Sequence, residues 1–442
     1  MTVDVARGQG IRRADETGQT VGRGAVGRGA VPAGFGVLLV LAALNLRPAI
    51  TSLSPLLPEI EASYGLASPR GVLLVALPTL VLGLGAPLAP WLARRLGQSA
   101  AVLVGLLVLA VGLLVRSLWA PVLFPATVVA AVGITIVAVA LPAVVKAHDP
   151  GRQGHWTAVY GLAMGLGSAA APFVTGLLDR ADVPVRESLG VWALLAGIAV
   201  LAWRLPRWTR ERERQPEATD GSDQDCATSP RTTTRGGSAF GVLRVGAARA
   251  LAAYFGLQAF LFFLLITYLP QYARSAGLDT TTAALLLSFF SLLTMVGSWV
   301  APRRVATLAD SRLFLALLSA GSAIGMVVLV TGGPVLLAVV LLGLAQGSIF
   351  PAALGLMVVR AADHRTATAL SMTSQCLGFS GAALALVILA QVHHEAGSWT
   401  GLWAAALVAV VLQGVVGWWA GASEVVSEDA SVQILSRSAE TH

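Results

Sequence analysis

The chain has 442 residues, of which 56% are hydrophobic and only 12% are charged, and its mean hydropathy is +0.75. Soluble domains carry about 25% charged residues, so this composition excludes a soluble protein and predicts an integral membrane protein. The formal net charge of +7 is explained below by membrane topology and does not indicate a nucleic-acid partner.

Twelve apolar segments are long enough to cross a bilayer as helices. A transmembrane helix needs about 20 consecutive apolar residues. The predicted spans are 34–57, 71–93, 99–118, 122–145, 156–178, 189–205, 249–270, 281–302, 312–331, 335–359, 367–391 and 401–420. The sequence therefore predicts an all-α integral membrane fold.

Polar segments divide these helices into two halves. Residues 1–33 are rich in Gly and Arg and contain no apolar core, so we expect a disordered cytoplasmic tail and not a signal peptide. Residues 206–248 contain alternating Arg and Glu and a Ser/Thr/Asp/Gly stretch, which predicts a cytoplasmic linker. This linker separates an N-terminal half, 34–205, from a C-terminal half, 249–420, and 421–442 form a second cytoplasmic tail.

The distribution of Arg and Lys predicts the orientation in the membrane. Basic residues concentrate in alternate connections, on the same side as the tails and the linker. The other side holds only Arg70, Arg116, Arg180, Arg186 and Arg274. Because cytoplasmic loops are enriched in Lys and Arg, we expect a multi-pass protein of the cytoplasmic membrane with both termini inside the cell.

The two halves carry weak signs of an internal repeat. Leu57-Pro58 precedes Gly65-Leu66 at the same spacing at which Leu269-Pro270 precedes Gly277-Leu278. Many transporters consist of two related halves, and their substrate site lies between the halves near the middle of the bilayer. We therefore expect helices from both halves to enclose a central cavity, which a single chain can do as a monomer.

Arg47 is the most informative residue of the first apolar span. No other Lys or Arg lies so deep in a membrane-length segment, and none of the 23 Asp and Glu residues falls well inside such a segment. A guanidinium at this depth costs several kcal/mol or more, so it needs a partner or a function. The hypothesis is that the partner is an anionic substrate. The alternatives are an arginine that reaches outward to the interface, or one that bonds backbone carbonyls as a structural pin.

Polar residues accompany Arg47 on its helix. Thr51 and Ser54 follow at i+4 and i+7, so all three lie on one face. Pro48 lacks a backbone N–H and can bend the helix, which frees a carbonyl at the same depth. We expect this face to line the cavity.

Several uncharged polar residues on other spans are candidates to contact the substrate. Gln375 and Ser371 share a face of the span 367–391, and Gln346 and Gln258 offer the same amide chemistry from neighbouring helices. Tyr160 can present its hydroxyl to the cavity. For each glutamine, hydrogen bonding between helices is an equally good explanation.

The sequence contains no signature of catalysis. It has two cysteines, no metal-binding cluster, no phosphate-binding loop and no nucleophile elbow. We expect no enzyme activity, no cofactor and no bound metal.

Three stretches resemble one family of membrane transporters. Leu44-Asn45-Leu46-Arg47-Pro48-Ala49-Ile50-Thr51-Ser52, followed by Pro55-Leu56-Leu57-Pro58, resembles the first-helix signature of the cyanate and 2-nitroimidazole transporter family (CynX/NimT), a branch of the major facilitator superfamily. Leu141-Pro142-Ala143-Val144-Val145-Lys146 and the region from Gln346 to Gly378 are also similar. The resemblance implies twelve helices in two six-helix halves and the passage of small, anionic or nitro-bearing compounds through a central cavity.

The chain departs from the superfamily pattern at the loop that follows the second span. Arg95 and Gly97 keep their expected positions, but Arg94 replaces the usual Asp. We expect these three residues to act in the cytoplasmic loop that gates the inner side, without that carboxylate. Phe379 stands where relatives are expected to carry a Tyr, which can alter substrate choice.

The sequence thus predicts a secondary or facilitative transporter of a small anionic or strongly polar solute that works by alternating access. A proton is a possible coupling ion, while exchange and facilitated diffusion remain open. One alternative is a multidrug efflux transporter, although a lone buried arginine opposes cationic substrates. A membrane sensor that does not transport is another alternative, but the linker and tails look too short and polar for a regulatory domain.

Overall fold

The computed structural model describes residues 34–66, 68–85, 95–118, 120–148, 152–205, 239–422 and 426. The predicted tails, most of the predicted linker and Arg94 lie outside the described residues. From Gly34 onward the described helices belong to one compact unit. The α-helices are α1 (Gly34–Leu44), α2 (Pro48–Thr51), α3 (Leu57–Tyr64), α4 (Ser68–Gly85), α6 (Gln98–Leu118), α7 (Leu123–His148), α8 (Gln153–Arg180), α9 (Val185–Arg204), α11 (Gly246–Ser275), α12 (Thr280–Thr307), α13 (Arg312–Val330), α14 (Val335–Val359), α15 (His364–Ala396) and α16 (Trp399–Ala420).

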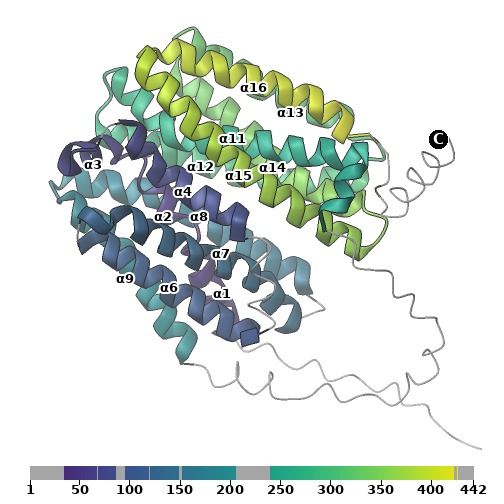
Figure 1. Cartoon of the computed structure of the whole chain (residues 1–442), viewed down its shortest axis with the longest axis horizontal. Helices are drawn as coiled ribbons and strands as arrows, with labels where there is room; N and C mark the ends of the chain where they lie inside the picture. The colour runs from purple at the N-terminus through teal and green to yellow at the C-terminus, as the bar shows by residue number, and fades with distance from the viewer. Residues whose placement is uncertain are drawn as a thin grey trace, which may run out of the picture. The chain divides into compact units, whose positions relative to one another are not determined.

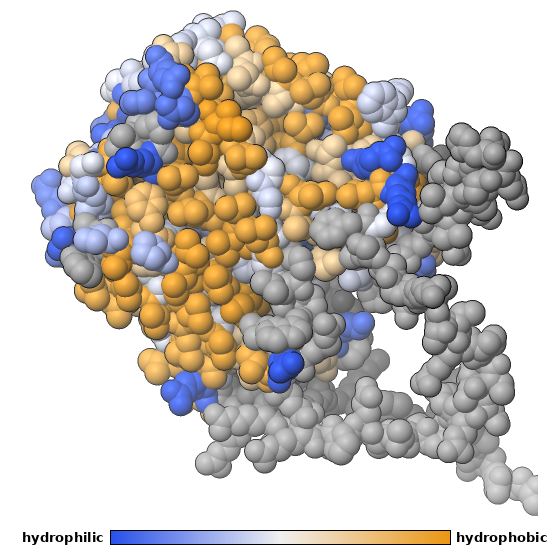
Figure 2. Space-filling view, viewed as in Figure 1, coloured by the Kyte–Doolittle hydropathy of each residue, from blue (hydrophilic) through white to orange (hydrophobic). Residues whose placement is uncertain are grey.

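The all-α membrane fold predicted from the sequence is confirmed. Eleven described segments are long and apolar enough to cross a membrane, with α1 and α2 forming one of them, and Arg70–Gly85 within α4 is a shorter apolar helix. Short 3-10 turns at Ala120–Val122 (η1) and Ala239–Arg244 (η5) complete the described helical elements. The face shown in Figure 2 is mostly hydrophobic, with hydrophilic residues near its edges. Exposed leucines such as Leu194, Leu201 and Leu313 are more than 60% accessible, as expected for side chains that contact lipid.

Local sequence explains several helix ends. Asp279 precedes α12, and its side chain accepts hydrogen bonds from the backbone N–H and the hydroxyl of Thr282. These bonds hold the pKa of Asp279 below its usual value. At the far end of α15, Gly397 takes a positive φ of 61°, the left-handed conformation that ends a helix and that glycine adopts without strain.

The helix packing repeats between the two halves. In the N-terminal half α6 packs against α7 and α9, α4 against α7, and α1 against α8 and α9. The C-terminal half has the corresponding pairs: α13 with α14 and α16, α12 with α14, and α11 with α15 and α16. Figure 1 shows two of these pairs, α6 with α9 and α13 with α16. The packing therefore supports the repeat that the sequence only suggested.

The two most extensive helix contacts between the halves are related to each other. α4 packs against α15, and α8 packs against α12. α4 and α8 are the second and fifth spans of the N-terminal half, and α12 and α15 are the second and fifth spans of the C-terminal half. In each contact the second span of one half therefore packs against the fifth span of the other. A space between the halves is consequently bordered by α8 and α12 on one side.

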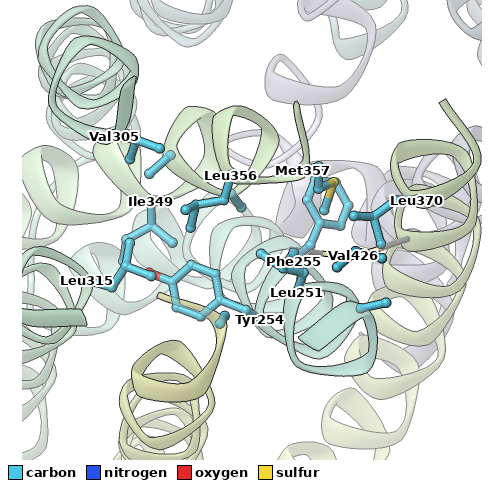
Figure 3. Packing of buried hydrophobic residues seen from close by; sticks show 14 of the residues in the cluster. Leu251, Tyr254, Phe255, Val305, Leu315, Ile349, Leu356, Met357, Leu370 and Val426 are labelled. Carbon is cyan, nitrogen blue, oxygen red and sulfur yellow. The ribbon is translucent and has the colours of Figure 1, made fainter. Parts of the chain in front are cut away.

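A buried hydrophobic cluster holds the C-terminal half together where α11 and α15 begin and α12 and α14 end. Figure 3 shows buried side chains from several helices meeting there. The labelled members are Leu251, Tyr254 and Phe255 of α11, Val305 of α12, Leu315 of α13, Ile349, Leu356 and Met357 of α14, and Leu370 of α15, with Val426. Arg360 ties the same region by donating hydrogen bonds to the carbonyls of Ala309 and Gly421. This end of the C-terminal half is therefore a rigid support for the helices that border the cavity.

Candidate functional site

Arg47 lies at an interruption of the first membrane span. The sequence predicted one helix over 34–57, but α1 ends at Leu44 and the four-residue α2 begins at Pro48. Pro48 has no N–H to donate to the carbonyl of Leu44, so the helical hydrogen bond at this point is lost. Arg47 occupies the junction, immediately before α2, and its carbonyl accepts hydrogen bonds from the backbone N–H groups of Ile50 and Thr51.

Neighbouring helices stabilise this interruption. A Cβ added to Gly167 of α8 would lie only 2.3 Å from the carbonyl oxygen of Leu44, so only glycine allows α8 to approach the break so closely. Arg116 of α6 is fully buried and donates a hydrogen bond of 2.8 Å from Nη1 to the carbonyl of Ala49. The side chain of Arg116 thus satisfies a backbone acceptor two residues after Arg47.

A cavity of about 520 Å³ lies between the two halves, and Arg47 lines it. Its walls come from α8 of the N-terminal half and from α11, α12, α14 and α15 of the C-terminal half. The only charged residues among the described residues of its lining are two arginines, Arg47 and Arg303. A cavity with two cations and no carboxylate in this described lining favours a negatively charged or strongly dipolar ligand.

The guanidinium of Arg47 is held without an anion. Its Cζ atom lies over the ring of Phe262 of α11, 5.2 Å from the ring centroid. Within the described part of the chain, no ion pair or hydrogen bond of this guanidinium is found. A cation–π contact supports the charge but leaves the N–H donors, which lie in the guanidinium plane, free for a ligand.

The cavity opens at one end of the bundle and is closed at the other. At the end where α8 begins and α12 ends, called here the Arg303 end, lining residues Thr157, Ala158 and Arg303 are exposed. Arg303 stacks over Trp299, with its Cζ 4.2 Å from the ring centroid. A ligand entering here therefore passes one arginine before it reaches Arg47.

At the opposite end, called here the Arg274 end, polar contacts join the two halves. Glu59 of α3 and Arg274 of α11 form an ion pair of 2.6 Å, with side chains 25% and 28% exposed. The Thr281 hydroxyl of α12 donates a 3.0 Å hydrogen bond to the carbonyl of Gly176 of α8. These contacts connect helices of the two halves at the end away from the mouth of the cavity.

The predicted site residues divide into two groups. Arg47, Tyr160 and Gln346 line the cavity together. The described cavity lining does not include the remaining candidates that the structure describes. These are Thr51, Ser54, Gln258, Ser371, Gln375, Arg95 and Gly97.

Thr51 and Ser54 follow Arg47 closely in the sequence. Both side chains are buried, and neither belongs to the described cavity lining. The Thr51 hydroxyl donates to the carbonyl of Arg47 over 3.2 Å, so it supports the backbone of the break. Ser54 Oγ is buried without a hydrogen-bond partner among the described residues. Arg47 and Thr51 remain one helical turn apart, but α2 ends at Thr51, so the helical spacing predicted for a continuous helix does not extend to Ser54.

Three glutamines form a buried network between helices of the C-terminal half. Gln258 Nε2 donates to the backbone carbonyl of Gln346 over 2.9 Å, and Gln413 Nε2 donates to Gln258 Oε1 over 3.1 Å. The side chain of Gln346 donates to Ser322 Oγ over 3.0 Å. Gln258 therefore takes the interhelical role that the sequence left as an alternative, and Gln346 both joins this network and borders the cavity.

Replacing Gln258 by leucine is expected to lower the thermal unfolding temperature of the purified protein. The substitution leaves Gln413 without its acceptor in a buried position, and such polar contacts in membrane bundles contribute about 0.6–1.7 kcal/mol. Thermal unfolding in detergent measures the effect. Gln391→Leu is the matched control, because Gln391 is exposed on α15. Equal unfolding temperatures for the two variants would contradict the structural role of Gln258.

The remaining predicted residues lie apart from the cavity. Gln375 donates to Ser371 Oγ over 2.9 Å within α15, where α15 packs against α4. Arg95 is exposed, and Gly97 takes a positive φ of 79° just before α6. This conformation explains why glycine suits the loop at that position.

Sequence reasoning missed three features of the site. Arg303 is one of the basic residues of the connections that predict the orientation, and the sequence gives no sign that it lines the mouth of the cavity. Arg116 is used in the sequence analysis only to predict the orientation, and its burial and its hydrogen bond to the carbonyl of Ala49 are not predicted. Phe262 gave no signal in the sequence, because its position over Arg47 depends on how α11 packs against the first span.

The fold and the cavity between related halves define a membrane transporter, and the comparisons with known proteins identify the family. The model of the Major Facilitator Superfamily matches residues 35–386, and the chain belongs to this family. Its members and the relatives below are transporters and not enzymes.

Bacterial relatives extend over most of the chain. The cyanate transport protein CynX of Escherichia coli (strain K12) is 31% identical over 384 residues, covering 85% of this chain and 94% of its own. The 2-nitroimidazole transporter of the same strain is 27% identical, covering 83% and 89%. The uncharacterized transporter YycB of Bacillus subtilis (strain 168) is 30% identical, covering 87% and 92%. The resemblance predicted from the first-helix motif is thus confirmed.

Solved structures agree on the fold. The D-xylose–proton symporter superposes with a TM-score of 0.68 at 14% identity, covering 87% of this chain and 97% of its own. The nucleoside transporter NupG (D323A mutant) superposes with a TM-score of 0.66 at 13% identity, covering 86% and 98%. At these identities the likeness concerns the fold and not the substrate.

Proposed function

We propose that this protein carries a small anionic or strongly polar solute, of the cyanate-like or nitroaromatic class, across the cytoplasmic membrane by alternating access. The observation that carries the proposal is the charge of the cavity. Arg47 lines it without an anionic partner among the described residues, Arg303 lines its mouth, and the described lining contains no Asp or Glu. Two of the relatives are transporters of cyanate and of 2-nitroimidazole, which supports the same class.

In this proposal Arg47 binds the negative end of the substrate. Tyr160 and Gln346 offer a hydroxyl and an amide from opposite halves. The Nε2 atom of Gln346 donates to Ser322 Oγ, and its Oε1 atom is buried without a hydrogen-bond partner among the described residues, so in this proposal the amide turns toward the cavity when the substrate binds. Substrate binding would therefore contact both halves, which is the requirement for coupling their movement to transport.

The proposed orientation of the protein in the membrane rests on the distribution of Arg and Lys between the two ends of the helical bundle. The Arg303 end carries most of the Arg and Lys of the connections, so the positive-inside rule places it in the cytoplasm with both termini. The described cavity then faces inward, and Glu59–Arg274 lies at the outer end. Transport would require residues 34–205 to rock against 249–420, breaking this ion pair as the outer end opens.

The test is uptake by the purified full chain in reconstituted vesicles, with and without a proton gradient. We expect saturable uptake of radiolabelled cyanate or 2-nitroimidazole, and no uptake of the organic cation ethidium. Uptake of ethidium without uptake of either polar solute would overturn the proposal and favour multidrug efflux. The dependence of uptake on the proton gradient shows whether a proton is the coupling ion.

Breaking the Glu59–Arg274 ion pair is expected to raise the fraction of molecules in which the outer end is open to solvent. Glu59→Gln removes the charge that meets Arg274, and a partly exposed pair contributes about 0.5–1 kcal/mol, which corresponds to a roughly two- to fivefold population shift. The measurement is the labelling rate of Thr281→Cys by a membrane-impermeant thiol reagent, on a Cys226→Ser/Cys376→Ser background.

Glu187→Gln is the matched control for this experiment. Glu187 is exposed in the first turn of α9, which lies on the same side of the membrane as the ion pair. Labelling should accelerate with Glu59→Gln and not with Glu187→Gln. Equal rates in both variants would show that the ion pair does not restrain the outer end.

A further inference from the structure

We infer that the preferred substrate of this cavity is an aromatic monocarboxylate, with its carboxylate on Arg47 and its ring between the phenylalanines of the C-terminal half. This inference rests on the proposed function as a transporter of a small anion, and it names a class of anion other than the cyanate-like and nitroaromatic solutes. It starts from three properties of the cavity: its size, its walls and the geometry of its buried cation.

The volume of about 520 Å³ is that of a site for an organic molecule. Pockets that bind drug-sized ligands range from about 300 to 1,000 Å³. A three-atom ion such as cyanate would contact Arg47 and leave most of the walls facing water. The binding free energy available from those walls would then be unused, so size alone favours a larger ligand.

The walls are aromatic and apolar on the side of the C-terminal half. Phe262 and Phe263 of α11, Phe350 of α14 and Phe379 of α15 all line the cavity. Their rings form a connected set, with centroids 5.7 Å apart for Phe262–Phe263 and 6.3 Å apart for Phe263–Phe379. Phe255 contacts both Phe350 and Phe379 from behind, at 5.5 and 5.2 Å.

Such a wall selects a flat ring. Aromatic rings pack edge-to-face or offset at centroid distances of about 4.5–7 Å, and these contacts add to the burial of apolar surface. The thioether of Met295, which also lines the cavity, makes favourable contacts with ring edges. Phe379 contributes to this selection because it has no hydroxyl, whereas a tyrosine at this position would make the wall more polar.

The geometry of Arg47 selects the head group. The Phe262 ring lies 5.2 Å from the Cζ atom of Arg47 and carries no oxygen or nitrogen acceptor, so it does not use the N–H donors of the guanidinium. Two parallel N–H donors match the two oxygens of a carboxylate, and such bidentate pairs are stronger than contacts with neutral acceptors. A nitro group has the same shape but no net charge, so it would leave the buried cation uncompensated.

A single carboxylate compensates the positive charge in the deep part of the cavity. Arg47 is the only cation among the described residues that line the cavity away from its mouth, and Arg303 stacks on Trp299 at the exposed end. Arg303 is therefore suited to attract an anion to the mouth and not to share the bound carboxylate. A monocarboxylate matches the single positive charge that remains.

The experiment compares ligands by isothermal titration calorimetry with the purified full chain in detergent. Calorimetry is chosen because weak organic acids cross lipid as neutral molecules and would confuse uptake. The ligands are 3-phenylpropionate, 3-phenylpropanol, cyanate and 2-nitroimidazole. We expect 3-phenylpropionate to bind at least tenfold more tightly than each of the other three.

Variants separate the ring contact from the charge contact. Phe379→Ala should weaken binding of 3-phenylpropionate at least fivefold and leave the affinity for cyanate within twofold. Phe289→Ala is the matched control, since Phe289 of α12 is exposed on the outside of the bundle and is not part of the described lining. It should leave both affinities within twofold of the wild type.

The outcomes distinguish this inference from the proposed function. Tighter binding of cyanate or 2-nitroimidazole than of 3-phenylpropionate would overturn the inference and leave the proposed function intact. The inference would also be wrong if Phe379→Ala and Phe289→Ala had the same effect. Absence of binding by all four ligands, together with absence of uptake in vesicles, would overturn both.

Discussion

Replacing Arg47 by glutamine is expected to weaken the binding of an anionic substrate by about 30- to 1,000-fold. A charge-assisted contact in a desolvated site contributes about 2–4 kcal/mol, and each 1.4 kcal/mol is a factor of ten. Phe262 lies over the guanidinium and carries no charge, so it cannot replace the lost contact with the anion. Initial uptake rates over a range of substrate concentrations in proteoliposomes give the change in KM and in kcat/KM.

The same substitution gives an opposite result for stability. Because no carboxylate or backbone acceptor is found on the Arg47 guanidinium within the described structure, its removal relieves an uncompensated charge at bilayer depth. We therefore expect Arg47→Gln to unfold at the same temperature as the wild type or higher. A structural pin would behave differently, with a lower unfolding temperature, and that result would reassign Arg47 to packing.

Arg186→Ala serves as the control for general effects of removing an arginine. Arg186 is exposed near the start of α9, on the side opposite to the mouth of the cavity. Uptake and stability of this variant should match the wild type. A comparable loss of uptake in Arg186→Ala would show that net charge, and not the position of Arg47, determines transport.

Replacing Gly167 by alanine is expected to cause a large loss of stability. The new Cβ would lie 2.3 Å from the carbonyl oxygen of Leu44 and 3.2 Å from its Cα, so α8 and the interrupted first span must separate. Overpacking of this kind costs about 1–3 kcal/mol and sometimes more. We expect a lower thermal unfolding temperature in detergent and, in the protein that remains folded, a higher KM because Arg47 moves with the break.

Gly161→Ala is the matched control on the same helix. A Cβ at Gly161 would meet no atom within 4 Å, since this residue faces the cavity. The variant should fold with the stability of the wild type. Similar unfolding temperatures for Gly167→Ala and Gly161→Ala would show that the close approach of α8 to Leu44 does not support the break.

The sequence was sufficient for most of the long helices and for the position of Arg47 within the first apolar span, but not for the interruption of that span. Long apolar segments determine their own helical structure in a membrane, because every backbone group must be hydrogen-bonded internally. The cost of a buried charge likewise marks Arg47 without any knowledge of its neighbours. These features depend on local composition alone.

The walls of the cavity could not be predicted in this way. Phe262 and Arg303 belong to helices far from Arg47 in sequence, and their positions depend on the packing between α8 and α12 and on the packing of α11 within its half. Thr51 and Ser54 are not in the described cavity lining. Thr51 turns its hydroxyl to the carbonyl of Arg47, and Ser54 follows the end of α2 at Thr51, so a helical spacing counted from Arg47 does not extend to it. Arg116 was missed because its partner is a backbone carbonyl, which no residue type in the sequence reveals.

The central claim is that Arg47 binds the negative charge of the substrate, and a comparison of charged and neutral ligands tests it most directly. The affinities of 3-phenylpropionate and of its neutral amide, 3-phenylpropionamide, are measured by calorimetry for the wild type and for Arg47→Gln. We predict that the wild type prefers the carboxylate by at least about 30-fold, a preference of about 2 kcal/mol, and that Arg47→Gln binds both ligands with similar affinity. A wild type without this preference, or a variant that keeps it, would contradict the account.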